Sequence, residues 1–100
     1  MANRFGIKIK QLREANSLLQ RQVAGKVSID TPMLSKIERG ERRAKKEQIS
    51  LFAELFGVCD SELMTLWLAD QLIRLVESET YALQAIQIAE QEVKMITKAI

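Results

Sequence analysis

Six cationic side chains gather near the middle of the chain and could bind phosphate oxygens. They are Lys36, Arg39, Arg42, Arg43, Lys45 and Lys46. Residues 1–50 carry 12 Lys or Arg against 5 Asp or Glu, a net charge of +7, whereas residues 51–100 carry 3 against 8, a net charge of −5. A basic half of this kind is typical of proteins with a polyanionic partner. The cluster is also compatible with an ordinary solvated loop, so charge alone leaves both interpretations open.

The residue types present argue against catalysis and against a metal or cofactor site. Histidine is absent and Cys59 is the single cysteine, which removes the commonest general base and the usual zinc ligands. The chain has no glycine-rich phosphate loop and no nucleophile motif. Since Cys59 sits in an apolar stretch, we expect a buried thiol. No segment has the pattern of a signal peptide or a membrane span, so a cytoplasmic protein is expected.

Apolar periodicity predicts an all-α chain. The predicted helices cover about residues 3–16, 20–27, 31–39, 47–56, 61–78 and 80–99. Asp30 is placed to cap the helix 31–39, and Gly40 to end it. The helices 20–27 and 31–39 are short and are joined by a tight turn at Ser28, which predicts a helix-turn-helix.

The helix-turn-helix would present one face of its second helix to a partner. Ala24 is small enough to let the two helices cross closely, and Leu34 and Ile37 would fill the space beneath the crossing. The outward positions are then Thr31, Pro32, Ser35 and Lys36, with Met33 at the margin. A helix exposed in this way fits the major groove of DNA.

Several spaced segments between about Phe5 and Leu63 resemble the Cro and phage-repressor (Xre) class of helix-turn-helix proteins. They are IKIKQLREANSL, the QxxVA core of the second helix, LSKIERG, ISLFAELFGV and CDSEL. The resemblance implies a five-helix, lambda-repressor-like domain in which the helix 31–39 enters the major groove. Three features depart from the family pattern. Leu19 stands where a capping residue is usual, and Ser28 stands where the turn often has glycine. The loop before the fourth helix lacks the usual proline.

The resemblance also implies roles for individual residues. Arg13 and Glu38 match a buried ion pair of the family, and Gln20 matches a residue that meets a DNA phosphate. Base contacts are expected from Thr31, Pro32 and Lys36. Together with the charge pattern, the resemblance predicts backbone contacts from Gln20, Met33, Ser35, Arg39, Arg42, Arg43, Lys45 and Lys46.

The last predicted helix lies outside the resemblance and has a heptad pattern. Its apolar positions are Ala82, Ile86, Ala89, Val93, Ile96 and Ile100, which are 4, 3, 4, 3 and 4 residues apart. The pattern favours dimerisation, although a helix packed on its own domain would also explain it. We expect a DNA-binding domain over residues 1–78 and a dimerisation helix over 79–100.

Together these features predict a dimeric, sequence-specific regulator of transcription that binds double-stranded DNA. The alternative is an antitoxin or protein-interaction module whose acidic C-terminal half binds a partner protein. The pattern does not distinguish a repressor from an activator. It also fits three biological settings, namely a restriction-modification controller, an antitoxin and a phage repressor.

Overall fold

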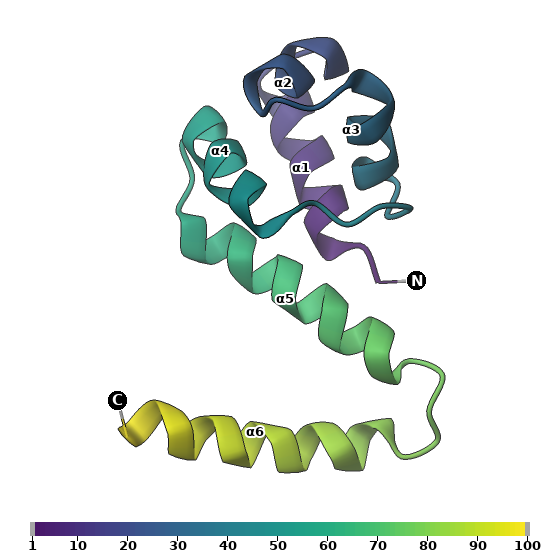
Figure 1. Ribbon diagram of the computed structural model, residues 1–100, viewed down its shortest axis with the longest axis vertical. Coiled ribbons are helices and arrows are strands. Elements are labelled where there is room, and N and C mark those ends of the chain that lie inside the picture. Colours follow the sequence, from purple (N-terminus) through teal and green to yellow (C-terminus); the bar gives the residue numbers. More distant parts are fainter. Residues whose placement is uncertain (1, 100) are drawn as a thin grey trace.

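The computed structural model describes residues 2–99, which form six helices and no strands (Figure 1). The helices are α1 (Arg4–Ala15), α2 (Gln20–Lys26), α3 (Thr31–Glu38), α4 (Lys46–Phe56), α5 (Asp60–Val76) and α6 (Ala82–Ala99). The predicted all-α class is confirmed, and each predicted helix is present with its ends shifted by a few residues at most.

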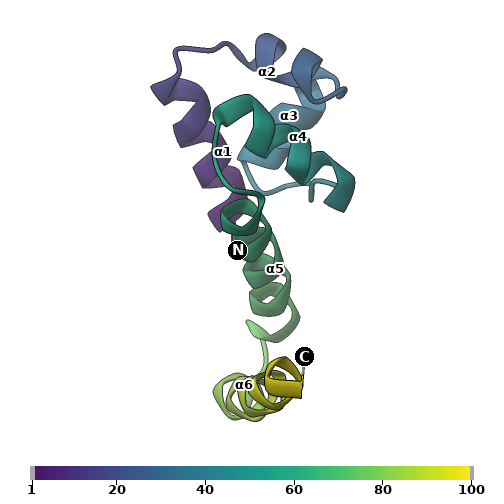
Figure 2. The same cartoon turned by 90° about the vertical axis from the view of Figure 1, so that its left-hand side faces the viewer.

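The helices form a globule with a helical extension. Helices α1–α4 cluster together, α5 leads away from them, and α6 turns back beneath α5 (Figures 1 and 2). No described helix is long and apolar enough to cross a membrane.

The hydrophobic core lies between α1, α2, α3, α4 and the first turn of α5. Its fully buried side chains include Ile9, Val23, Val27, Leu34, Ile37, Ile49, Phe52 and Leu63. Phe52 is central, and its ring meets the Phe5 ring edge-on at a centroid distance of 5.9 Å. Burying a side chain of this size stabilises the fold by about 1.5–3 kcal/mol. This core fixes the relative orientation of α2 and α3.

Local signals in the sequence set the ends of α3. The Asp30 carboxylate accepts a hydrogen bond from the Met33 backbone N–H at 2.8 Å, as a capping residue should. Pro32 lies in the first turn, where its missing N–H has no helical partner to lose. Gly40 follows the helix with a φ of 78°, a left-handed conformation that glycine adopts without strain.

Two of the departures from the family pattern, at Leu19 and Ser28, are visible in the structure. Leu19 precedes α2 and offers no side-chain cap, but the Gln22 side chain accepts a hydrogen bond from the Leu19 N–H at 2.7 Å. Ser28 has a φ of 59°, which is uncommon for a residue other than glycine and costs some stability.

Two polar side chains of α5 hold the N-terminal segment of the chain. The buried Asp70 carboxylate accepts hydrogen bonds from the backbone N–H groups of Arg4 and Phe5, both at 2.9 Å. The Arg74 guanidinium donates to the Ala2 carbonyl oxygen at 2.8 and 3.1 Å. Asp70 therefore satisfies donors at the start of α1 that have no partner within that helix.

The prediction of a buried thiol at Cys59 is wrong, because this residue is exposed. Gly57 ends α4 in a left-handed conformation, and Cys59 precedes α5 with an extended backbone. This sharp turn directs Leu63, one helical turn later, into the core and leaves Cys59 at the surface.

Candidate nucleic-acid interface

Helix α3 has one face in the core and one face in solvent. Leu34 and Ile37 are fully buried, and Ala24 of α2 is also buried where the two helices pack. Gly6 allows a close approach of α1 to α3, since a Cβ at this position would overlap the Ile37 carbonyl oxygen. The backbone of α3 is therefore held firmly from behind.

The outward face of α3 contains the residues that the sequence predicted. Thr31, Pro32 and Lys36 are exposed, and Met33 and Ser35 are partly buried beside them. A shallow pocket of about 220 Å³ is lined by Asp30, Pro32, Met33, Lys36 and Arg42. Apolar, cationic and anionic side chains thus lie together at α3 and beside it.

Arg13 and Glu38 form the predicted ion pair behind this face. Arg13 Nε donates to Glu38 Oε2 at 2.7 Å and Nη2 donates to Oε1 at 3.1 Å. The Glu38 side chain is only 3% exposed. The hydrogen bond from Arg13 to Glu38 raises the pKa of Arg13, so the guanidinium stays charged. A bidentate pair of this geometry fixes the end of α3 against α1.

Gln20 belongs to the same polar network. Its side-chain Nε2 donates to Glu38 Oε1 at 3.1 Å. Arg13 also donates to the Leu18 carbonyl oxygen at 3.1 Å, so the segment that leads into α2 is tied to the pair. One N–H of the Gln20 side-chain amide is therefore already bonded to Glu38. The predicted contact with a DNA phosphate would have to come from another N–H group of Gln20.

The end of α3 has a second ion pair that lies at the surface. The Arg39 guanidinium donates to the Glu41 carboxylate and to the Ser35 hydroxyl oxygen. The hydrogen bond between Arg39 and Glu41 lowers the pKa of Glu41 and raises the pKa of Arg39. Both Arg39 and Ser35, which were predicted to contact the DNA backbone, thus have partners within the protein.

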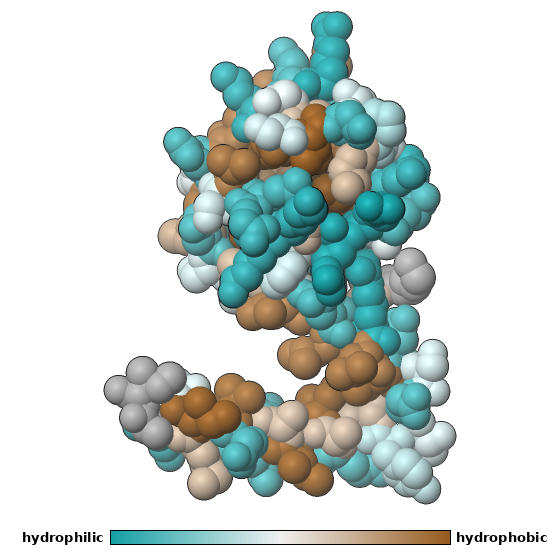
Figure 3. Space-filling model, viewed as in Figure 1, coloured by the Kyte–Doolittle hydropathy of each residue, from teal (hydrophilic) through white to brown (hydrophobic). Residues whose placement is uncertain are grey.

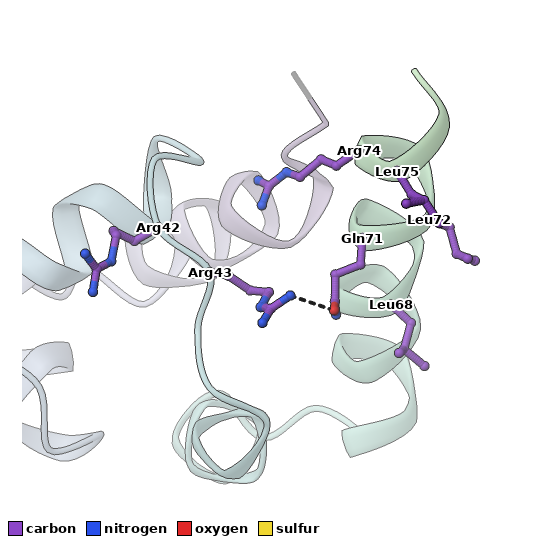
Figure 4. Close-up of a pocket in the computed structure, with 7 residues that line it drawn as sticks. All are labelled: Arg42, Arg43, Leu68, Gln71, Leu72, Arg74 and Leu75. Atoms are coloured by element: carbon purple, nitrogen blue, oxygen red, sulfur yellow. Dashed lines mark hydrogen bonds between the residues drawn. The ribbon is translucent and has the colours of Figure 1, made fainter. Parts of the chain in front are cut away.

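Arg42 and Arg43 are adjacent but point in different directions (Figure 4). Arg43 Nη1 donates to Gln71 Oε1 at 2.8 Å, and the guanidinium lies 5.7 Å from the Trp67 ring centroid. Figure 4 shows Arg42 directed away from α5. No hydrogen bond or ion pair is found for the Arg42 side chain within residues 2–99.

Two further cations stand at the start of α4. Lys45 precedes this helix and Lys46 begins it, and both are exposed. With Lys36 and Arg42, which line the pocket beside α3, they make four exposed cationic side chains between α3 and the start of α4. We name this set of four the cationic rim. Cationic side chains of this kind can bind phosphate groups.

Comparison with known proteins identifies the family from the N-terminal two thirds of the chain. Residues 4–67 match the family model of a helix-turn-helix domain. The chain belongs to the helix-turn-helix domain family. The narrower resemblance to the Cro and phage-repressor class remains a prediction from the sequence.

A solved structure shares the fold of this helix-turn-helix protein. It is the crystal structure of the clp gene regulator ClgR from Corynebacterium glutamicum, with a TM-score of 0.59 and 18% sequence identity. The likeness covers 92% of this chain and 87% of that one, so it extends beyond the matched domain. No curated protein sequence matches this chain.

Sequence reasoning missed the residues of α5 that support the interface. Trp67, Asp70, Gln71 and Arg74 recur at intervals of three, one and three residues, so they share one face of α5. That face meets the N-terminal segment and the loop before α4, where Trp67 Nε1 donates to the Ala44 carbonyl oxygen at 2.8 Å. The regular spacing of these polar residues along α5 could have indicated a shared face. The groups that they bind are distant in the sequence, so their roles could not be predicted.

Proposed function

We propose that this protein is a transcriptional regulator that binds double-stranded DNA sequence-specifically, with α3 in the major groove. The observation that carries the proposal is the exposure of Thr31, Pro32 and Lys36 on a helix fixed by the core and by a buried ion pair. Base recognition needs side chains held in a defined position, and α3 meets this requirement.

The chemistry of these three residues limits which bases they can recognise. The Lys36 ammonium can donate to O6 and N7 of guanine. Thr31 can donate or accept a hydrogen bond, or contact the methyl group of thymine. Pro32 offers only apolar contact, which also suits a thymine methyl. Because three such residues specify few base pairs, the shape of the DNA would contribute to selectivity.

The cationic rim would supply most of the affinity. Its four members have no ion-pair partner among the described residues, so they are available to phosphates. Displacement of counterions from DNA makes such binding strongly dependent on salt.

We further propose that the protein binds as a dimer through α6. The predicted dimerisation residues Ile86, Val93 and Ile96 are 40%, 58% and 55% exposed, and Ala89 is exposed as well. Ile100 lies outside the described residues. A two-fold dimer would place two copies of α3 about 34 Å apart, one turn of DNA.

The alternative of a module that binds a partner protein is favoured only by the exposed apolar face of α6. Residues 82–99 carry two Glu and two Lys, so α6 has no net charge. An acidic docking surface on α6 is therefore not supported, and the DNA-binding proposal is preferred.

Fluorescence anisotropy of labelled duplex DNA tests the proposal. We expect binding of a random-sequence duplex at low ionic strength, with an affinity that falls as salt is raised. A variant with Lys36, Arg42 and Lys45 replaced by alanine should bind much more weakly. The control replaces Lys94 and Lys98 of α6, and its affinity should be unchanged provided that sedimentation shows the same state of association as the parent. Absence of binding at low ionic strength would overturn the proposal.

A further inference from the structure

An apolar band runs along the second half of α5 and the whole of α6, apart from the core. Every described side chain from residue 83 to residue 98 is exposed. The band includes Leu68, Leu72 and Leu75 of α5, which are 49%, 59% and 75% exposed. Figure 3 shows apolar side chains on both walls of the hollow between α5 and α6. The hollow contains a groove of about 600 Å³, whose apolar lining is Leu72, Ile86, Ala89 and Val93.

The area of this band is that of an interface. Ten large apolar side chains from Leu68 to Ile96 are at least 40% exposed. Ile88 and Met95 lie on the opposite side of α6 from Ile86 and Val93. The remaining side, together with the leucines of α5, exposes roughly 600 Å² of apolar surface, which is the upper end of the largest patch on a typical monomer. A stable interface between proteins buries about 800 Å² per partner, of which only part is apolar. The band therefore has enough apolar surface for a stable dimer.

The spacing of the band indicates that its occupant is a helix. Leu68, Leu72 and Leu75 are four and three residues apart, which is the spacing that α6 also has. Figure 4 shows Leu68, Leu72 and Leu75 lining one pocket together with Gln71 and Arg43. Of the three leucines, Leu72 also lines the groove beside α6. Two helices with this spacing pack against further helices of the same kind, as in a four-helix bundle.

We propose that the occupant of the groove is α6 of a second copy of this chain. Each α6 would lie between α5 and α6 of the other copy, so that the two extensions interlock into a four-helix bundle. This inference rests on the proposed dimer and specifies its architecture. Pairing of α6 with α6 alone would leave Leu72 in solvent, whereas the exchange covers Leu72 together with Ile86, Ala89 and Val93. The zero net charge of α6 allows two copies to meet without overall repulsion.

Glutamate substitutions in the full chain test the exchange by sedimentation. Leu72→Glu on α5 and Val93→Glu on α6 should each weaken self-association by at least about tenfold, because each buries a carboxylate without a partner. The matched control is Ile7→Glu on α1, where Ile7 is 52% exposed outside the band. Circular dichroism should show the same helix content in all three. A dimer that survives Leu72→Glu but not Val93→Glu would overturn the exchange and leave α6 pairing intact.

Disulfide trapping gives a second, independent readout. In a Cys59→Ser background, chains carrying Leu72→Cys are mixed with chains carrying Ile86→Cys, Ala89→Cys or Val93→Cys, and then oxidised. At least one mixture should yield a linked pair, since a disulfide needs Cα atoms within about 7 Å. Mixing with Ile7→Cys chains should yield none. If the chain sediments as a dimer and no mixture links, the exchange is excluded.

The outcomes separate this inference from the proposed function. A monomeric full chain that still binds duplex DNA would overturn the exchange and the dimer but not DNA binding. A dimer that links as described but binds no duplex would support the exchange and overturn the proposed function.

Discussion

Arg13 of α1 and Glu38 at the end of α3 form a bidentate ion pair, with Nε 2.7 Å from Oε2. The pair lies behind the helix proposed to enter DNA, and the Glu38 side chain is almost fully enclosed. Gln20 donates to the same carboxylate, so the entry to α2 and the end of α3 share one anchor.

Replacing Glu38 with alanine should lower the free energy of unfolding by about 3–5 kcal/mol, because Arg13 would keep a buried charge without its partner. Replacing both residues with methionine should cost less, since neither charge then remains. Urea denaturation followed by Trp67 fluorescence measures both changes. Glu90→Ala breaks the exposed pair with Lys94 and serves as the control, with an expected cost below about 0.5 kcal/mol. A double variant less stable than Glu38→Ala would contradict the explanation.

Replacing Asp70 with alanine should cost about 2–3 kcal/mol, because the N–H groups of Arg4 and Phe5 lose their acceptor near the core. Asp70→Asn should cost less, since its amide oxygen can still accept one hydrogen bond. Thermal unfolding measures the difference. Glu54→Ala on α4, which removes an exposed carboxylate, should leave the midpoint unchanged. An Asp70→Ala protein as stable as the parent would show that this cap is dispensable.

Much of the architecture could be predicted because its signals are local. Asp30 and Gly40 mark the ends of α3 within a few residues, and apolar spacing marks the buried positions of each helix. Asp70 could not be predicted as a cap, because the N–H groups that it binds lie 65 and 66 residues away. The hydrogen bonds of Gln20 to Glu38 and of Arg43 to Gln71 could not be predicted either. The place of a residue in the sequence indicates that its side chain is near the surface, but not which other side chain it binds. Cys59 was predicted to be buried because its neighbours are apolar, but it lies in a sharp turn between α4 and α5 and is exposed.

Replacing Lys36 with alanine should weaken binding to the preferred site by about 1–3 kcal/mol and should relax the preference for one base pair. Competition against duplexes with single base changes measures both effects. Lys98→Ala on α6 removes an equal charge far from α3 and should change neither. An equal loss of affinity on every duplex would mean that Lys36 contacts only phosphate.

Replacing Arg42 with alanine should remove one phosphate contact. The slope of log affinity against log salt concentration should then become shallower by about 1. Arg43→Ala should reduce it less, because the Arg43 guanidinium is engaged by Gln71 and lies near the Trp67 ring. The slope of log affinity against log salt concentration separates the two arginines. Equal slopes for the two variants would show that Arg43 leaves Gln71 to contact DNA.

Selection of binding sites from a pool of random duplexes at low ionic strength is the most direct test of the central claim, that α3 enters the major groove. We expect enrichment of a two-fold symmetric sequence with half-sites about 10 base pairs apart. A protein with Thr31 and Lys36 replaced by alanine should lose that enrichment while it still retains DNA weakly. Retention of no duplex by the parent protein, or the same enriched sequence with both residues replaced, would contradict the account.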